Sequence, residues 1–230
     1  MKKAKNLKRL LLAVLLLCFL LLGSTLQSTP LPPTEQTVLL TGFGPFLNIT
    51  NNPTQSIAEQ LNNTQLNNAS IISIILPVSF EQSIQTMKEA IQQFEPDLII
   101  SLGLEDKSSS IHLELIGTNL KRTQLANGRW SIPHFILLGK RLFYTSTLPL
   151  LEIKSNLLDN TIPTKLSLGA GTYVCNSLFY QTQHYLHTTN QDIPMGFIHL
   201  PQQQSIDPNG LPLDQMSQAV QHIITTSLTN

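Results

Sequence analysis

Apolar runs and helix-period segments alternate along the chain from residue 37 onward. Runs of about four to eight apolar residues between glycine, proline or polar clusters are typical of buried strands, and longer amphipathic segments are typical of helices. The predicted strands are Thr37–Leu40, Ile71–Val78, Asp97–Leu102, Ser110–Ile116, Lys165–Leu168 and Met195–Leu200. The predicted helices are Thr54–Leu61, Ser79–Phe94, Leu148–Leu158, Tyr173–Leu186 and Leu213–Leu228.

This alternation of strands and helices indicates an α/β fold in a single domain. We expect a mostly parallel twisted sheet that is flanked by helices on both faces. The second predicted helix begins with a capping-box pattern, in which Ser79 precedes Gln82 by three residues, and Pro96 follows its end. The stretch Gln124–His134 has the least regular pattern, and no internal repeat or second domain is evident.

The first residues have the pattern of a secretory leader. Five basic residues lie within the first nine positions, and the apolar run Leu10–Leu22 follows them. This run is shorter than the roughly 20 residues of a free-standing transmembrane helix, and no clear cleavage site follows it. We therefore predict export, to the periplasm or the medium, with residues 1–23 as a signal peptide or as an N-terminal anchor that tethers the protein to the membrane. Residues 24–36 are predicted to be a proline-containing linker, and residues 37–230 the folded domain.

The charge of the predicted domain argues against one class of partner. The chain has 14 basic and 14 acidic residues, but five of the basic ones lie in the leader and none of the acidic ones does. The remaining nine basic and 14 acidic residues give the rest of the chain a net charge of −5. Nucleic-acid binding depends on a basic stripe, so no nucleic-acid partner is expected.

Cys175 is the first candidate for chemistry. The chain has two cysteines: Cys18 lies in the apolar run, and Cys175 lies in Gly169–Asn176, where a glycine turn leads from a strand into a helix. The positive end of a helix dipole favours a thiolate, and free N–H groups of such a turn can hold an oxyanion. On pattern alone, however, a lone cysteine in an apolar segment is more often a small buried core residue.

A cysteine nucleophile needs a base and a group that orients the base. His199 lies at the end of a predicted strand, where open α/β sheets place their sites, although a purely structural hydrogen bond is as plausible there. Glu114 is the candidate for the orienting group. It shares a strand face with His112, which could pair with Glu114 in place of His199, and the pattern alone favours a solvent-facing glutamate. His184 and His187, three residues apart on a helix, favour a polar helix face over a metal site, so no metal is expected.

Six short motifs occur in order along the chain. They are Leu40–Phe46, Asn52–Thr54, Leu76–Val78, Ser146–Pro149, Ala170–Asn176 and Gly196–Pro201. In their residues and spacings they resemble pyroglutamyl peptidase I, the pyrrolidone carboxyl peptidase family of cysteine peptidases, from Thr37 to about Leu228. Cys175 and His199 are 24 residues apart, as in that family, and Glu114 falls where the family has its catalytic glutamate.

The resemblance implies an enzyme that removes an N-terminal pyroglutamyl residue from peptides without a metal or other cofactor. Cys175 would attack the carbonyl of that residue. His199 would take the thiol proton and later protonate the leaving amine, while Glu114 would orient His199. Family members often form tetramers, so a homo-oligomer is among the assemblies that the resemblance implies.

The resemblance also implies a substrate pocket. Phe43 and Phe46 match family positions that line it, and Asn52 matches a position that supports it. Aromatic faces suit a flat, neutral lactam ring. By pattern alone, phenylalanines in a loop beside a strand are more often core residues than site residues.

The chain departs from the family pattern between residues 107 and 127. Lys107 and Ser108 replace a Gly-Arg pair, and Leu115 and Gln124 each replace an arginine. We expect these changes to cluster on one side of the pocket, and they leave two alternatives open: a cysteine hydrolase of the same fold with another blocked peptide or small amide as substrate, or a non-catalytic binding protein on this scaffold. The enzyme alternatives predict a fast-reacting Cys175 thiol, and the binding protein predicts a slow one.

Overall fold

The computed structural model describes residues 35–47, 49–125 and 128–229. The predicted leader, with its apolar run at residues 10–22, lies outside the described residues, as does the linker up to residue 34. Strand β1 (Gln36–Phe43) begins at Gln36, so the last residue of the predicted linker belongs to the sheet. Across the ranges described, no helix is both long and apolar enough to cross a membrane.

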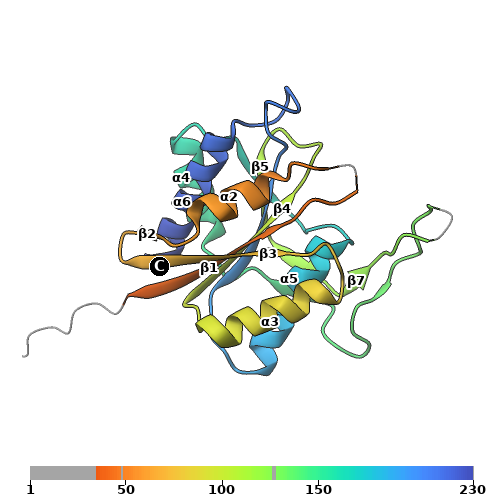
Figure 1. Cartoon of the computed structure of the whole chain (residues 1–230). Coiled ribbons are helices and arrows are strands. Elements are labelled where there is room, and N and C mark those ends of the chain that lie inside the picture. The colour runs from red at the N-terminus through yellow and green to blue at the C-terminus, as the bar shows by residue number, and fades with distance from the viewer. Residues whose placement is uncertain (1–34, 48, 126–127, 230) are drawn as a thin grey trace, which may run out of the picture. The chain divides into compact units, whose positions relative to one another are not determined.

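A seven-stranded mixed sheet runs through the domain (Figure 1). In sheet order its strands are β10 (Thr164–Ser167), β5 (Ile111–Glu114), β11 (Met195–Leu200), β4 (Leu98–Leu104), β1, β3 (Ala69–Leu76) and β2 (Thr64–Leu66). Four neighbouring strands, β11, β4, β1 and β3, run parallel, as the sequence predicts. The two sides of the sheet differ from this centre, because β2 is antiparallel to β3, and β5 is antiparallel to β11 while β10 runs parallel to β5.

Helices cover both faces of the sheet, which confirms the predicted α/β architecture (Figure 1). They are α2 (Pro53–Leu61), α3 (Gln82–Phe94), α4 (Leu150–Asp159), α5 (Val174–Thr188) and α6 (Leu213–Leu228). Helices α2, α4 and α6 share one core with the sheet, and α3 and α5 share the other. Because successive side chains of a strand point to opposite faces, Val38 and Leu40 of β1 belong to the first core, and Leu39 to the second. Burial on both faces explains why these strands are continuous apolar runs.

The predicted strand Ser110–Ile116 is in fact two strands. Strand β5 ends at Glu114, and β6 (Ile116–Thr118) pairs with β9 (Phe143–Thr145) in a separate small sheet. Leu115 lies at the break, where its N–H and its carbonyl bond to two segments that are distant in sequence. The alternation of side chains does not reveal this change, because it depends on which distant segments the chain meets.

Helix α3 begins at Gln82, three residues after its predicted start at Ser79. The intervening residues form a turn, in which the Ser79 N–H donates to the Pro77 carbonyl at 2.9 Å. The Ser79 hydroxyl still accepts the N–H of Gln82 at 3.3 Å, which is one half of the predicted capping box.

A hairpin that the sequence pattern does not predict projects from the domain near α5 (Figure 1). Its strands β7 (Leu120–Lys121) and β8 (His134–Phe135) pair antiparallel, and Gln124 bridges to Trp130 further out. We call residues 120–135 the arm. The stretch with the least regular sequence pattern is therefore the outer part of this hairpin.

The base of the arm is fastened to the start of α5 by Asn176, which is fully buried. The Asn176 side chain accepts the Thr118 N–H at 2.8 Å and donates to the carbonyls of Thr118 and Leu120 at 2.9 and 2.8 Å. Each of these bonds satisfies a backbone group that would otherwise be unpaired at the edge of a short strand. Because Asn176 follows Cys175 in the chain, these bonds fix the position of the arm relative to Cys175.

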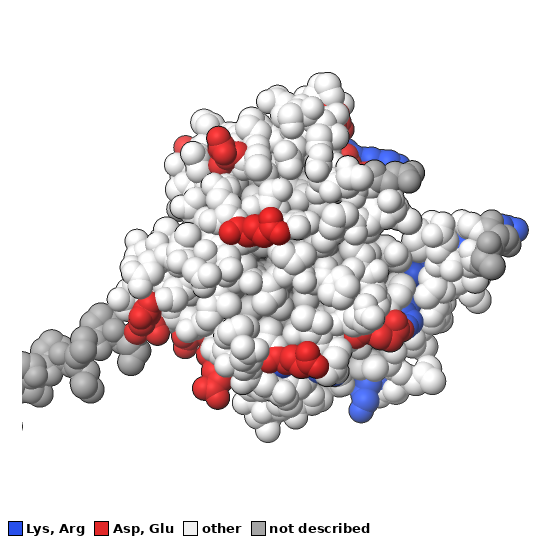
Figure 2. Space-filling view, in the orientation of Figure 1, with Lys and Arg blue, Asp and Glu red and all other residues white. Residues whose placement is uncertain are grey.

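Charged side chains are sparse on the face shown in Figure 2. Acidic side chains stand singly on a largely uncharged surface, and basic ones appear mainly toward the side from which the arm projects. The described residues on this face show no continuous basic stripe of the kind that nucleic-acid binding requires.

Candidate active site

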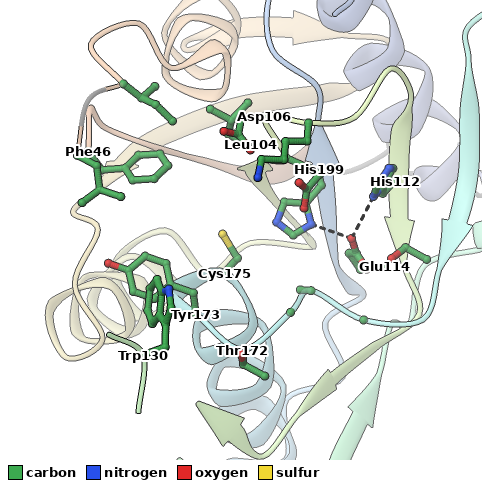
Figure 3. A pocket seen from close by; sticks show the side chains of 18 residues that line it. Phe46, Leu104, Asp106, His112, Glu114, Trp130, Thr172, Tyr173, Cys175 and His199 are labelled. Carbon is green, nitrogen blue, oxygen red and sulfur yellow. Dashed lines mark hydrogen bonds and ion pairs between the residues drawn. The ribbon is translucent and has the colours of Figure 1, made fainter. Parts of the chain in front are cut away.

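Cys175 lies at the start of helix α5, at the wall of an open cleft (Figure 3). The turn before it contains Gly171 with φ of 77°, a left-handed conformation that glycine adopts at little cost. The N-cap residue Tyr173 makes no side-chain capping bond, and the N–H groups of a first helical turn have no partner within the helix. These N–H groups and the helix dipole favour negative charge on the sulfur or beside it.

His199 and Glu114 reach this cleft from neighbouring strands. The antiparallel pairing of β5 with β11 sets His112 opposite His199, and Glu114 follows two residues later on the same face. His199 Nδ1 donates to Glu114 Oε1 over 2.7 Å, and both side chains are buried. Figure 3 shows the His199 ring between the Glu114 carboxylate and the Cys175 sulfur. The structure therefore brings the three predicted catalytic residues together.

The His199 ring packs closely over Gly103, its register partner on β4. A Cβ atom on Gly103 would lie 2.8 Å from His199 Cδ2 and 2.7 Å from the Phe197 ring, and both of these rings are buried. A glycine at this position therefore allows His199 its place in the site. The sequence places Gly103 at the end of a predicted strand, which is a hint of close approach, but it does not identify the neighbour.

Opposing effects act on the pKa of His199. Burial disfavours the charged ring and lowers the pKa, but the contact with the Cys175 side chain, the hydrogen bond to Glu114 and the negative charges of both outweigh burial and raise the pKa from 6.5 to about 10. His199 is therefore protonated near neutral pH. A protonated His199 beside the Cys175 sulfur can supply a proton to a leaving group.

Glu114 is buried, with 1% of its surface exposed. The solvent-facing position that the sequence pattern favours is therefore wrong. β5 is an inner strand, so side chains of β10 and β11 flank Glu114, and the His199 ring lies against its carboxylate. His112, the rival partner, is the more distant one, with Nδ1 4.0 Å from Glu114 Oε1.

The cleft has a volume of about 740 Å³ and two chemically different sides. Phe46, Trp130 and Tyr173 give it an aromatic side, on which Trp130 and Tyr173 meet edge to face with ring centroids 5.2 Å apart (Figure 3). The charged residues on its lining, beside the site itself, are Glu105, Asp106 and Lys107. Sequence reasoning missed Trp130 and Tyr173, and the one available signal was that Trp130 is the single tryptophan of the chain.

The three predicted substrate-binding residues line a narrow hollow of about 20 Å³ beside Cys175. Phe43 is buried at the end of β1, and Phe46 is half-buried on the loop that follows. Asn52 caps helix α2 with its side-chain oxygen, and its side-chain nitrogen donates to the Gly44 carbonyl at 3.1 Å. Asn52 therefore supports the loop that carries Phe46, and its polar atoms are used within the chain.

The four departures from the family pattern do not cluster on one side of the pocket, so that expectation is wrong. Lys107 lines the cleft. Ser108 is buried, Leu115 packs against the core on the α4 and α6 side, and Gln124 is exposed on the arm. Of these four residues, Lys107 is the one placed to touch a molecule in the cleft.

His184 and His187 lie in an aromatic cluster on α5. The Tyr144 hydroxyl contacts His184 Nδ1 at 2.9 Å, and the Tyr180 ring stacks on the His184 ring. The Tyr144 ring also meets His187 edge to face. Within the described parts of the chain, no three His, Cys, Asp or Glu side chains are grouped so that they could hold a metal ion.

The fold and the site together define a class of protein. An α/β sheet carries a histidine between a buried carboxylate and a cysteine, and the cysteine lies at a helix N-terminus facing an open cleft. This is the arrangement of a cysteine hydrolase, in which the cysteine is the nucleophile, the histidine is its base and the carboxylate orients the histidine.

Comparison with known proteins identifies the family. A family model described as pyroglutamyl peptidase matches residues 36–229. The pyrrolidone-carboxylate peptidase of Thermococcus litoralis is 35% identical over 166 residues, which cover 71% of this chain and 76% of the relative. The crystal structure of pyroglutamyl peptidase I from Bacillus amyloliquefaciens is similar with a TM-score of 0.79 and 32% identity, over 85% of this chain and 96% of that one. The chain therefore belongs to the pyroglutamyl peptidase family, and the resemblance seen in the sequence is confirmed.

Proposed function

We propose that this protein is a cysteine peptidase that removes an N-terminal pyroglutamyl residue from peptides. The observation that carries the proposal is the line of contacts from Glu114 through His199 to Cys175 beside an open cleft, on the scaffold of this family. Keeping a buried imidazolium costs free energy unless its partners are held in place. A binding protein has no need of such a group beside a thiol, so the site favours catalysis.

In the first half of the proposed reaction, the Cys175 sulfur attacks the carbonyl carbon of the pyroglutamyl residue. The oxyanion that forms lies beside the free N–H groups at the start of α5. His199 gives its proton to the leaving nitrogen as the C–N bond breaks. This step releases the shortened peptide and leaves a pyroglutamyl thioester on Cys175, with His199 neutral.

In the second half, neutral His199 takes a proton from a water molecule whose oxygen attacks the thioester carbonyl. The C–S bond then breaks, pyroglutamate leaves, and the sulfur anion and the imidazolium are restored. Throughout both halves Glu114 holds the Nδ1–H of His199 in the 2.7 Å bond, so Nε2 is the nitrogen that exchanges protons.

The hollow beside Cys175 is the proposed place of the lactam ring. The rings of Phe43 and Phe46 on its wall suit a flat, neutral group. The hollow adjoins the larger cleft, because Phe46, Tyr173 and Cys175 line both, so the ring would lie where the two meet. The rest of the peptide would follow the cleft past Trp130 and Lys107.

Hydrolysis of a pyroglutamyl-linked fluorogenic amide tests the proposal. We expect the full-length, reduced protein to release the fluorophore and its Cys175→Ala variant to release none, with the same thermal unfolding. Cys18→Ser is the matched control, because it removes the other thiol and should keep the parent rate. A folded, reduced parent that releases nothing would reject the proposal and leave a hydrolase for other blocked peptides or amides, or a binding protein.

We also propose that the protein is exported. The support is the basic start of the chain and the apolar run at residues 10–22. Cell fractionation of the full-length chain and of a chain without residues 10–22 tests this. Processed protein outside the cytoplasm would indicate a cleaved signal, and full-length protein in the membrane fraction would indicate an anchor. Both chains in the cytoplasm would contradict export.

Self-association is a further proposal, supported by exposed apolar side chains on and after the arm. Ile132 and Leu138 are 84% and 83% exposed, and Leu142 and Phe143 are exposed as well. Isolated apolar side chains on a surface are ordinary, but a group of them marks an interaction surface. Light scattering after size exclusion should give an oligomer for the parent and a smaller species for Ile132→Asp, and a monomeric parent would contradict self-association.

A further inference from the structure

Trp130 is a large aromatic side chain that the fold leaves partly uncovered beside the nucleophile. It lies on the arm, is 47% exposed, and lines the same cleft as Cys175 (Figure 3). The residues that line the narrow hollow proposed for the lactam ring do not include Trp130. Tryptophan is among the residues that contribute most energy at binding surfaces, because its large ring has few torsions to fix. Its open surface is therefore a candidate contact for a part of the substrate other than the lactam.

Contacts between the arm and the turn before Cys175 hold Trp130 in this place. The Arg122 N–H donates to the Thr172 carbonyl at 2.8 Å. The Trp130 ring meets the Tyr173 ring with centroids 5.2 Å apart, and the Phe80 ring meets the same Tyr173 ring at 5.4 Å. The three rings form a row that ends at the cleft with Trp130. A surface that is fixed before a ligand arrives loses little conformational freedom on binding.

Trp130 also borders free space on the side toward the arm. With Arg122, Thr172 and Tyr173 it lines a second, open hollow of about 220 Å³. Trp130, Thr172 and Tyr173 line the cleft as well, so this hollow adjoins the cleft. A side chain that reaches Trp130 from the cleft therefore has room to lie along its ring.

The second residue of the peptide is the part of the substrate that comes next to the lactam, because its nitrogen is the one that leaves. The hollow for the lactam has a volume of about 20 Å³, so the rest of the peptide belongs in the larger cleft. The cleft offers it an aromatic wall with Trp130 and a charged wall with Asp106 and Lys107. Asp106 and Lys107 have opposite charges and are exposed, so water and salt weaken what each can contribute. Burial of apolar surface on Trp130 carries no such loss.

We propose that Trp130 is a specificity residue, whose ring binds the side chain of the second residue of the peptide and favours an aromatic or large apolar one. The inference rests on the proposed function and names the class of peptide that the site prefers. An aromatic side chain on Trp130 removes apolar surface of both rings from water and adds the attraction between the rings. An alanine side chain covers little of the ring and gains little from it.

The first test compares kcat/KM for two pyroglutamyl dipeptide amides, with phenylalanine or alanine as the second residue. The parent should prefer the phenylalanine substrate roughly tenfold. In Trp130→Ala this ratio should fall to about twofold or less through loss of the phenylalanine substrate alone, and Trp130→Phe, which keeps a ring, should retain most of it. Phe135→Ala is the matched control, because Phe135 is also 47% exposed on the arm but is not among the described residues that line the cleft, so it should keep the parent ratio. Thermal unfolding checks that each variant is folded.

The second test observes binding without hydrolysis. Trp130 is the single tryptophan of the chain, so tryptophan fluorescence reports on this ring alone. In Cys175→Ala, which has no nucleophile, the phenylalanine substrate should shift the emission to shorter wavelength and slow its quenching by acrylamide. Free pyroglutamate, which has no second residue, should do neither.

An equal substrate ratio in the parent and Trp130→Ala would overturn the proposal, and so would an equal loss of both substrates, which would mark Trp130 as structural. A preference for a charged second residue that disappears in Lys107→Gln would assign this contact to the charged wall instead. Hydrolysis of both substrates with neither the ratio nor the fluorescence dependent on the second residue would reject the role of Trp130 and keep the proposed function. Protection of Trp130 without hydrolysis by the parent would reject the proposed function and keep the contact.

Discussion

Replacing Glu114 by glutamine should remove most of the activity and leave the fold in place. Glutamine keeps the volume and one hydrogen-bonding oxygen, but it removes the buried negative charge. That charge and the contact with Cys175 raise the pKa of His199 from 6.5 to about 10, which corresponds to roughly 5 kcal/mol in favour of the imidazolium. Without the negative charge of the carboxylate, less remains to offset the effect of burial, which disfavours the imidazolium, so the pKa of His199 should fall.

The pH dependence of kcat/KM measures this effect. In the parent, His199 must carry a proton to protonate the leaving amine, so the rate should fall as the pH rises through about 10. In Glu114→Gln the fall should come at lower pH, and kcat/KM at pH 7 should drop by about 10²- to 10⁴-fold. Glu152→Gln, on the exposed side of α4, is the matched control and should change neither value. An alkaline limb at the same pH in Glu114→Gln and the parent would refute the reasoning.

Further predictions concern stability and packing. The folded state keeps the His199 proton up to about pH 10, so the contribution of this proton to stability is complete below pH 6.5 and should decline above it. Measured by urea unfolding, the free energy of unfolding should fall relative to that of His199→Asn by up to about 1.4 kcal/mol per pH unit. Parallel pH profiles of the two proteins would contradict this. Gly103→Ala should slow alkylation of Cys175, because its Cβ would lie 2.8 Å from His199 Cδ2, and an unchanged rate would show that the ring can shift freely. Asn176→Ala should lower the unfolding free energy by about 2–4 kcal/mol, because backbone groups at the base of the arm lose their partners; a change near zero would mean that they find others.

Much of the fold could be predicted because the central strands are buried on both faces. Strand β11 and helix α6 have the predicted bounds, since an apolar run between clear stop signals fixes both ends. The short strands β2, β7, β8 and β9 were not predicted. They have two or three residues each and form through pairing with other segments, so their own residues carry little pattern.

The site was predictable in part. A glycine turn before a helix and a histidine at a strand end pointed to Cys175 and His199, and the family resemblance added Glu114. The burial of Glu114 and the place of Trp130 depend on which strands and loops meet, and alternation along one segment cannot show that. The roles of these residues in turnover stay predictions until they are measured.

Trapping of a thioester on Cys175 tests the central claim most directly. The full-length, reduced protein is mixed with the pyroglutamyl amide, quenched in acid during turnover and digested, and its peptides are weighed by mass spectrometry. The account predicts one added pyroglutamyl group on the peptide that contains Cys175, and neither adduct nor turnover in Cys175→Ala. Turnover by Cys175→Ala, or turnover by the parent with the adduct on another residue, would contradict it.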